Sequence, residues 1–442
     1  MRSHTRRRPI VVRRTIVLGS ALVAACASTQ QSGNESDLTA RARGIHERVV
    51  TMDTHVDISP NNFQPGQQNY VTGVNTQVDL PKAEQGGLDA IWFSIYQGQQ
   101  DDFTAEGYGR AHATAIAKVE AVKRLTAELA PQRIALATTA ADVRRISGER
   151  KKVALMGMEN GYAIGEDITN VKKFADMGVR YLSLAHNGHS QLADSNTGER
   201  DGYKWNGLSP LGRQAVAEAN RWGIVMDISH PSKQANLQTM QLSRAPVMAS
   251  HSAIRALADH SRNLDDEQLR ALKANGGVVQ VVAFSSYLKI TSPSPERTQA
   301  LAALRQGFGL PAQGGGRGGR GGGGGGLQAL TTEQRAEYDR KLADIDRRLP
   351  APARASVKDL VDHIDYAVKL IGIDHVGISS DFDGGGGVDG WNGAAETFNV
   401  TLELVRRGYT EQQIAKIWSG NLVRVMGEVE RVAAQLQRTA SE

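Results

Sequence analysis

Eight short apolar runs recur along the chain, and helical patterns separate them. Runs of this length that are bounded by turn residues are typical of buried β-strands. They are RVVTMDTHVD (48–57), LDAIWFSIY (88–96), KVALMGMEN (152–160), VRYLSLAHN (179–187), IVMDISHPS (224–232), PVMASHSA (246–253), GVVQVVAF (277–284) and HVGISSDFD (375–383). The pattern therefore predicts eight strands.

The segments between the runs carry apolar residues at spacings of three and four, which predicts helices over 111–130 and 210–223. The second helix has a Ser-Pro start signal at its first residues and a stop signal at Gly223. Strands that alternate with helices indicate a parallel sheet, and eight such units favour an α/β fold of the (β/α)8 barrel type. An open, doubly wound sheet is the alternative fold.

Polar residues fall at the carboxyl ends of these strands. In a barrel those ends form one rim around one mouth, where such folds carry their chemistry. A single buried histidine or carboxylate is more often a hydrogen-bonded core residue, but seven that share one rim indicate a site. They are His55, Asp57, Glu159, His186, His230, His251 and Asp381.

Four histidines and three carboxylates on one rim offer the nitrogen and oxygen ligands that suit borderline divalent metals such as zinc. Such a set can serve two ions if one carboxylate bridges them. Two neighbouring metal ions can polarise a carbonyl and activate a shared water. The rim therefore predicts metal-dependent hydrolysis.

Several longer motifs carry a resemblance to a known family. They are DTHVDI, MENG, LSLAHNGHSQLADS, GLSPLGRQAVAEANRWGIVMDISHPS, SHSAIRALADHSRNLDD, GIDHVGISSDFDGG and IWSGNLVRVMG. In this order they resemble the renal (membrane) dipeptidases, which are binuclear zinc peptidases of the amidohydrolase superfamily. The resemblance covers about residues 44–430, and it implies a metal-dependent hydrolase barrel that cleaves dipeptides.

The resemblance implies five metal ligands. His55 and Asp57 are expected to bind one zinc ion, His230 and His251 are expected to bind the other, and Glu159 is expected to bridge both.

Three further residues are expected to act on the substrate. His186, in AHN, should contact the scissile carbonyl oxygen, and Arg262, in HSRN, should pair with the substrate carboxylate. Asp381, in SDFDGG, should bind substrate and move protons during catalysis. The resemblance also implies a homodimer and tolerance of a D-residue at the second position of the dipeptide.

Two features depart from the family. MENGYA stands where Glu-Gly-Gly-His is more usual after the bridging glutamate, so the substrate pocket is expected to differ. The stretch QGGGRGGRGGGGGG (313–326) has no family counterpart and is too rich in glycine to form a core. It is expected to be a flexible insertion between the seventh and eighth strands.

The first 25 residues read as an export signal, because six arginines are followed by the apolar stretch TIVLGSALVAAC. LVAAC resembles a bacterial lipobox, which predicts lipidation of Cys26, the only cysteine. A plain secretory signal is the alternative, and RRTIV also resembles a twin-arginine signal. Residues 26–43 are expected to carry the lipid and form a tether, 44–430 the catalytic domain, and 431–442 a tail.

From the charge balance, a nucleic-acid partner is not expected. The formal net charge is +5, but the six arginines of residues 1–25 account for it and leave the rest near neutral. We therefore expect a lipoprotein of the bacterial cell envelope, in the periplasm or anchored to the outer membrane, with small dipeptides as substrates.

Three functions agree with these observations. The leading one is an exported, membrane-anchored zinc dipeptidase. The second is another amidohydrolase that acts on a lactone, a lactam or an acylated amino acid. The third is a catalytically silent binding lipoprotein, which the complete set of metal-binding residue types disfavours.

Overall fold

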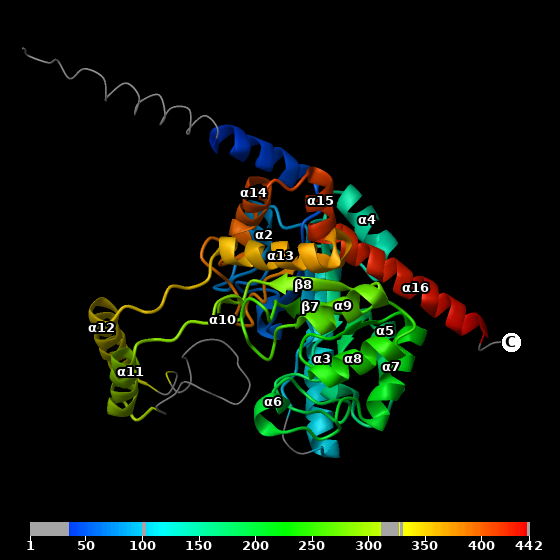
Figure 1. Ribbon diagram of the computed structural model, residues 1–442, viewed down its shortest axis with the longest axis horizontal. Helices are drawn as coiled ribbons and strands as arrows, with labels where there is room; N and C mark the ends of the chain where they lie inside the picture. Colours follow the sequence, from blue (N-terminus) through cyan, green and yellow to red (C-terminus); the bar gives the residue numbers. More distant parts are fainter. Residues whose placement is uncertain (1–34, 100–102, 311–326, 328–329, 440–442) are drawn as a thin grey trace, which may run out of the picture.

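The computed structural model describes residues 35–99, 103–310, 327 and 330–439. Its centre is a barrel of parallel strands in sequence order, surrounded by helices (Figure 1). The barrel strands are β1 (Met52–Asp57), β2 (Ala90–Ser94), β4 (Lys152–Met158), β5 (Val179–Ser183), β6 (Val225–Asp227), β7 (Met248–Ser252), β8 (Val278–Val282) and β9 (Val376–Ser379). Each lies within one of the eight runs, so the predicted strands are confirmed.

The sheet closes between its first and last strands. Val56 of β1 pairs in parallel with Phe382, which follows β9, and the Asp57 amide donates to the Phe382 carbonyl at 2.9 Å. This closure confirms the (β/α)8 type of fold and excludes the open doubly wound sheet. A further strand, β3 (Ile134–Leu136), pairs with the beginning of β4. The sequence pattern missed it because only three residues are extended.

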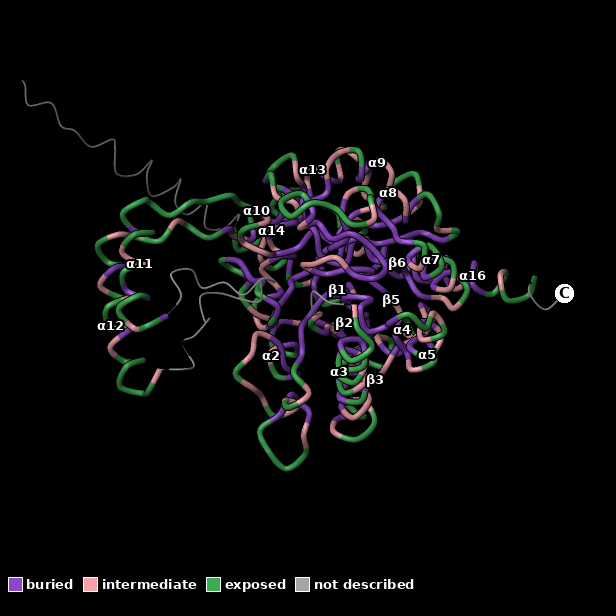
Figure 2. The backbone as a smooth tube through the Cα atoms, turned by 90° about the horizontal axis from the view of Figure 1, so that it is seen from below, coloured by how far each residue is buried: buried purple, intermediate pink, exposed green. Residues whose placement is uncertain are grey.

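Helices cover the outside of the barrel, and Figure 2 shows the buried strands inside them. The longer ones are α2 (Leu80–Gly86), α3 (Ala105–Arg124), α4 (Ala140–Gly148), α5 (Asn170–Asp176), α7 (Pro210–Trp222), α8 (Lys233–Leu242), α9 (Asp266–Asn275), α13 (Val357–Ile371), α14 (Phe398–Arg406) and α16 (Asn421–Thr439). The shorter ones are α6 (Gly198–Asp201), α10 (Ser285–Leu288) and α15 (Glu411–Ala415).

Both predicted helices are present. The helix expected over 111–130 is α3, which continues as a π-helical turn over Leu125–Leu129. The helix expected over 210–223 is α7, where the Ser209 hydroxyl accepts from the Gly212 amide at 3.0 Å. Gly223 ends it with φ of 73°, a left-handed conformation that glycine adopts without strain.

The core of the barrel continues into the last helix. Buried side chains from the beginnings of the strands, such as Met52 and Val278, cluster with Trp92 and with Val425 and Met426 of α16. Helix α16 therefore packs against the amino-terminal end of the barrel. The opposite end, where the strands finish, is left for the loops that carry the polar residues.

Two segments extend the folded body beyond the boundaries expected from sequence. Residues 35–48 form a helix in which Ala42 and Ile45 are buried, so the described part of the expected tether is helical. At the other end, α16 runs through the expected tail and buries Val432 and Ala433. Both segments are ordered because one apolar face of each packs on the barrel domain.

Helices α11 (Pro295–Gly307) and α12 (Thr332–Arg348) form an arm that stands away from the barrel (Figure 1). They pack on each other through a small cluster of their own that includes Leu304, Tyr338 and Ile345. The glycine-rich segment 313–326 connects them and lies outside the described residues. Among the described residues, no helix is both long enough and apolar enough to span a bilayer.

Candidate metal centre

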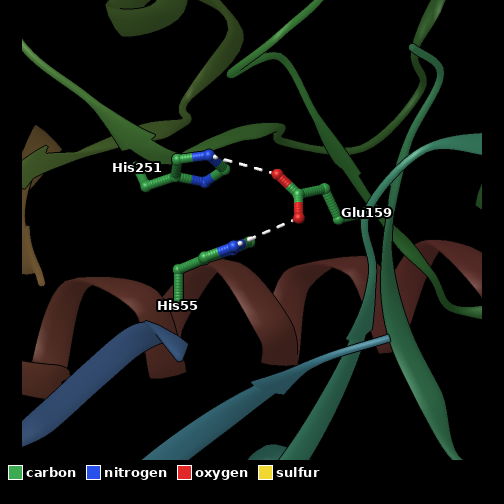
Figure 3. A group of neighbouring side chains, drawn as sticks. All are labelled: His55, Glu159 and His251. Carbon is green, nitrogen blue, oxygen red and sulfur yellow. Dashed lines mark ion pairs between the residues drawn. The ribbon is translucent and has the colours of Figure 1, made fainter. Parts of the chain in front are cut away.

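Glu159 lies at the centre of the polar rim, directly after β4. Its Oε1 atom lies 2.9 Å from His230 Nε2 and 3.5 Å from the Nε2 atoms of His186 and His251. Its Oε2 atom lies 3.4 Å from His55 Nε2, and Figure 3 shows one carboxylate oxygen facing His55 and the other facing His251. Four imidazoles from four strand ends therefore converge on one buried carboxylate.

The rim provides three overlapping groups of ligand atoms, each within 4.8 Å of one another. Glu159 belongs to two of the groups, as a bridging carboxylate would. The groups are His55, Glu159 and His251; Glu159, His186 and His230; and His55, Asp57 and Asp381. All seven rim residues that the sequence indicated are thus brought together.

The grouping differs in detail from the expected pairs. His251 was expected beside His230, and their Nε2 atoms do lie 2.9 Å apart, but its ring also lies over His55 with centroids 3.8 Å apart. His186 was expected to contact substrate, and it shares a group with Glu159 and His230. Its ring lies 4.2 Å from that of His230, so it borders the metal ligands directly.

Three of the histidines are oriented by a hydrogen bond at Nδ1. Tyr181 Oη lies 2.9 Å from His55 Nδ1, Asn187 Oδ1 lies 3.2 Å from His230 Nδ1, and Ser250 Oγ lies 2.8 Å from His251 Nδ1. Such partners fix the tautomer and turn the other ring nitrogen toward the site. Each Nε2 is thereby directed at Glu159.

The electrostatics of the group favour binding of cations. Burial alone would raise the pKa of Glu159, but His55 and His186 outweigh it and hold that pKa well below its usual value. Burial lowers the pKa of His230 and of His251 well below normal, and Arg262 contributes to the decrease at both. His230 and His251 therefore offer neutral nitrogen lone pairs beside a charged carboxylate, as a metal ion requires. Burial alone would lower the pKa of His55, but Glu159 outweighs it and raises that pKa to about 9, so a metal ion must displace a proton from His55.

Asp381 is buried in a space that it shares with the carboxylates of Asp57 and Glu159. Burial, together with the carboxylates of Asp57 and Glu159, raises its pKa to about 8 against the opposing effect of His55. Lys118 of α3 compensates part of the charge, since its Nζ lies 3.7 Å from Asp57 Oδ1. The donor set therefore fits divalent cations, and His55 Nε2 is buried without a hydrogen-bond partner among the described residues.

Gly384 closes over the acidic side of the site. A Cβ atom placed there would lie 2.2 Å from Asp381 Oδ1 and 2.5 Å from Asp57 Oδ2. Only a residue without a side chain leaves both carboxylates in place.

We predict that Gly384→Ala lowers kcat/KM about a hundredfold, because displacing catalytic groups by about 1 Å can cost that much. Peptide hydrolysis and circular dichroism of the purified variant would check this. Gly109→Ala is the matched control, because a Cβ atom at Gly109 has no neighbour within 4 Å. Wild-type turnover by the Gly384 variant would contradict the predicted role.

Arg262 lies beside the histidines on the other side of the site. It is 2% exposed, and its Nη2 donates to the His251 carbonyl at 3.1 Å and lies 3.2 Å from His230 Nε2. Its buried Nε has no hydrogen-bond partner among the described residues. The guanidinium is thus fixed next to the ligand histidines with a donor still available.

Sequence reasoning missed several residues of the site. Tyr96, Asn187 and Phe284 line the pocket from positions shortly after β2, β5 and β8, and Tyr287 lines it from α10. Lys118 could have been found, because a lysine lies within the apolar stripe of α3 and is 4% exposed.

Asp227 could have been found as well, since it lies in MDISH three residues before His230. It is buried, and it accepts from the Ser250 hydroxyl at 2.6 Å. The same hydroxyl contacts His251 Nδ1, so Asp227 supports that histidine indirectly.

Comparison with known proteins agrees with this geometry. The family profile described as "Membrane dipeptidase (Peptidase family M19)" matches residues 39–440. The chain belongs to the membrane dipeptidase family. The resemblance inferred from the motifs is therefore confirmed, and the chain is a peptide hydrolase of the metallo-dipeptidase type.

Related members show how far the likeness extends. Dipeptidase tcpJ of Claviceps purpurea is 30% identical over 394 residues, which span 88% of this chain and 76% of that protein. The crystal structure of the probable dipeptidase PvdM from Pseudomonas aeruginosa is 35% identical with a TM-score of 0.73, and covers 90% of this chain and 100% of that one.

A metallopeptidase from Rhodobacter sphaeroides, whose structure holds a phosphinate mimic of L-Ala-D-Ala, shares the fold with a TM-score of 0.62 at 21% identity. The match covers 86% of this chain and 99% of that one.

Proposed function

We propose that the protein is a zinc-dependent dipeptidase that hydrolyses the peptide bond of free dipeptides. The observation that carries this proposal is the position of Glu159, whose two oxygens lie 2.9–3.5 Å from four histidine Nε2 atoms. This arrangement suits two ions bridged by one carboxylate. When bound there, zinc would polarise the scissile carbonyl and generate a nucleophile from water at neutral pH.

We keep the ligand assignments that the family resemblance implies. We assign His55 and Asp57 to one ion, His230 and His251 to the other, and Glu159 to both. His186 borders the histidine side, where it is placed to donate a hydrogen bond to the carbonyl oxygen of the substrate.

The charges at the two sides of the site match the two ends of a dipeptide. The Arg262 guanidinium lies on the side of His230, whereas Asp381 and Asp57 lie on the side of His55. A free dipeptide carries a carboxylate at one end and an ammonium at the other. We infer that its C-terminal residue faces Arg262 and its N-terminal residue faces the carboxylates.

Arg262→Lys should raise KM for dipeptides about tenfold, because a guanidinium grips a carboxylate bidentately and an ammonium does so poorly. The wild type should also hydrolyse an amidated dipeptide poorly, and the variant should discriminate less between the two substrates. Steady-state kinetics on a dipeptide and its amide would measure both effects. Unchanged discrimination would remove Arg262 from the substrate pocket.

The second candidate function is hydrolysis of a lactone, a lactam or an acylated amino acid by the same metal centre. The third is binding without catalysis. Zinc content by elemental analysis, together with turnover of a panel of dipeptides, lactones and acylated amino acids, separates the three. The panel should include L-Ala-D-Ala, because a mimic of that dipeptide is bound in the Rhodobacter sphaeroides structure.

We propose further that the enzyme is exported and anchored to the bacterial cell envelope through a lipid on Cys26. This rests on the sequence of residues 1–26, which lie outside the described residues. Cys26→Ala should release the protein from membranes and leave the activity of the purified enzyme unchanged, because the lipid provides the attachment. Fractionation of cells that express each form would measure this. Equal recovery of both forms in the membrane fraction would contradict the anchor.

A further inference from the structure

A second cavity, of about 350 Å³, adjoins the metal centre at Asp57. It is built mainly from the loop that follows β1 and from the segment that follows β9, and Asp57 lines both this cavity and the metal-site pocket. The residues that matter for its chemistry are Asn62, Phe63, Tyr70, Thr76 and Asp383. Because its walls come from the carboxyl ends of strands, the cavity opens on the same face as the site.

The floor of this cavity is aromatic and rigid. Phe63 and Tyr70 stack with ring centroids 4.9 Å apart and 17° between their planes, and Phe93 meets Tyr70 edge-on at 5.6 Å. Tyr70 is 2% exposed, and its hydroxyl has no hydrogen-bond partner among the described residues. A buried hydroxyl without a partner is costly, and a polar group that reached it from the cavity would satisfy it.

Asp383 provides a fixed negative charge at the edge of the cavity. Its carboxylate accepts from the backbone amides of Gln77 at 2.8 Å and Val78 at 3.3 Å. Burial raises the pKa of the Tyr70 hydroxyl well above its usual value, and the Asp383 carboxylate adds to this increase. Both residues line the cavity. No lysine or arginine is among the described residues that line the cavity.

The cavity lies on the side of the site that receives the N-terminal half of a dipeptide. Arg262 marks the opposite side, beside His230. The side chain of the N-terminal residue therefore points past Asp57 toward Tyr70 and Asp383.

We propose that this cavity binds the side chain of the N-terminal residue and selects an amine-bearing side chain, as in lysine, at that position. The inference rests on the proposed dipeptidase function and names its substrate class. The aliphatic stem packs on the Phe63–Tyr70 floor, the ammonium donates to the Asp383 carboxylate, and the Tyr70 hydroxyl accepts a second hydrogen bond.

The test compares Lys-Ala with norleucine-Ala, which has the same four-carbon stem without the ammonium. At about pH 8, where a lysine side chain is charged, the wild type should show kcat/KM about tenfold higher for Lys-Ala, since charge-assisted hydrogen bonds are the strong ones. Asp383→Asn should bring this ratio close to one. Tyr70→Phe should lower the ratio about threefold, and it removes no hydrogen bond made within the described protein.

Asp389→Asn is the matched control, because Asp389 follows β9 in the same loop, lies outside the cavity lining and has a side chain that is 62% exposed. It should keep the wild-type ratio. A wild-type ratio near one, or an Asp383→Asn variant that slows both peptides equally, would overturn the inference while dipeptide hydrolysis itself stands. Failure of the wild type to hydrolyse either these two or any other dipeptide would overturn the proposed function as well.

Discussion

Replacing Glu159 by glutamine is expected to remove bound metal and to lower kcat by about 10⁴-fold or more, because both the nucleophile and the polarised carbonyl depend on the metal ions. The physical reason is charge. Glu159 is 3% exposed and is surrounded by four imidazoles, so its carboxylate is the negative group common to both expected ion positions. A neutral amide cannot hold two dications close together.

Elemental analysis of metal content and kinetics on a dipeptide would measure the effect of Glu159→Gln. Glu166→Gln is the matched control, because Glu166 follows on the same loop and is exposed. The control should keep wild-type metal content and wild-type rate. A Glu159→Gln enzyme that retained about two zinc ions per chain would contradict the bridging role.

Asp381→Asn is expected to lower kcat by about 10²- to 10⁴-fold while metal content stays unchanged, which is the range that a positioned acid–base group supplies. Burial raises the pKa of Asp381 to about 8, which lies close to the range in which a carboxyl group can both accept and release a proton at neutral pH. A carboxyl group with such a pKa can take a proton from the attacking water and deliver it to the leaving amine. The amide of asparagine can do neither.

The backbone conformation at Asp381 is compatible with asparagine, so the substitution tests the side chain alone. Its φ of 57° lies in the left-handed region, which asparagine tolerates better than most residues. The variant should therefore keep the segment after β9 in place, and circular dichroism would verify this. If Asp381→Asn loses metal while Glu159→Gln keeps it, the two roles are exchanged and this account of the site is wrong.

The fold could be predicted from the sequence because its apolar residues recur in clear strand and helix patterns. Each barrel strand lies in an apolar run, and the Ser209 and Gly223 signals mark the ends of α7 correctly. Strand β3 and the helix over residues 35–48 could not be predicted in this way. The strand has only three residues, and the helix follows a polar segment and is ordered by the burial of Ala42 and Ile45.

The sequence predicted which residues form the site better than it predicted how their side chains are arranged. His55, Glu159 and His251 all stand at strand ends, and parallel strands bring such ends to one rim. Which imidazole faces which carboxylate oxygen depends on side-chain rotation. That rotation is set by partners distant in sequence, such as Tyr181 for His55, 126 residues away.

The sequence by itself determined the barrel, the rim and the types of group on it, because strand periodicity and the position of a residue at a strand end are local properties of the chain. Only the tertiary structure decided that Lys118 approaches Asp57, that Gly384 closes over two carboxylates, and that Tyr70 and Asp383 face one cavity. These contacts join loops and helices whose relative positions are fixed by packing around the closed barrel. Distances between residues far apart in the chain arise from that packing, and no local pattern encodes them.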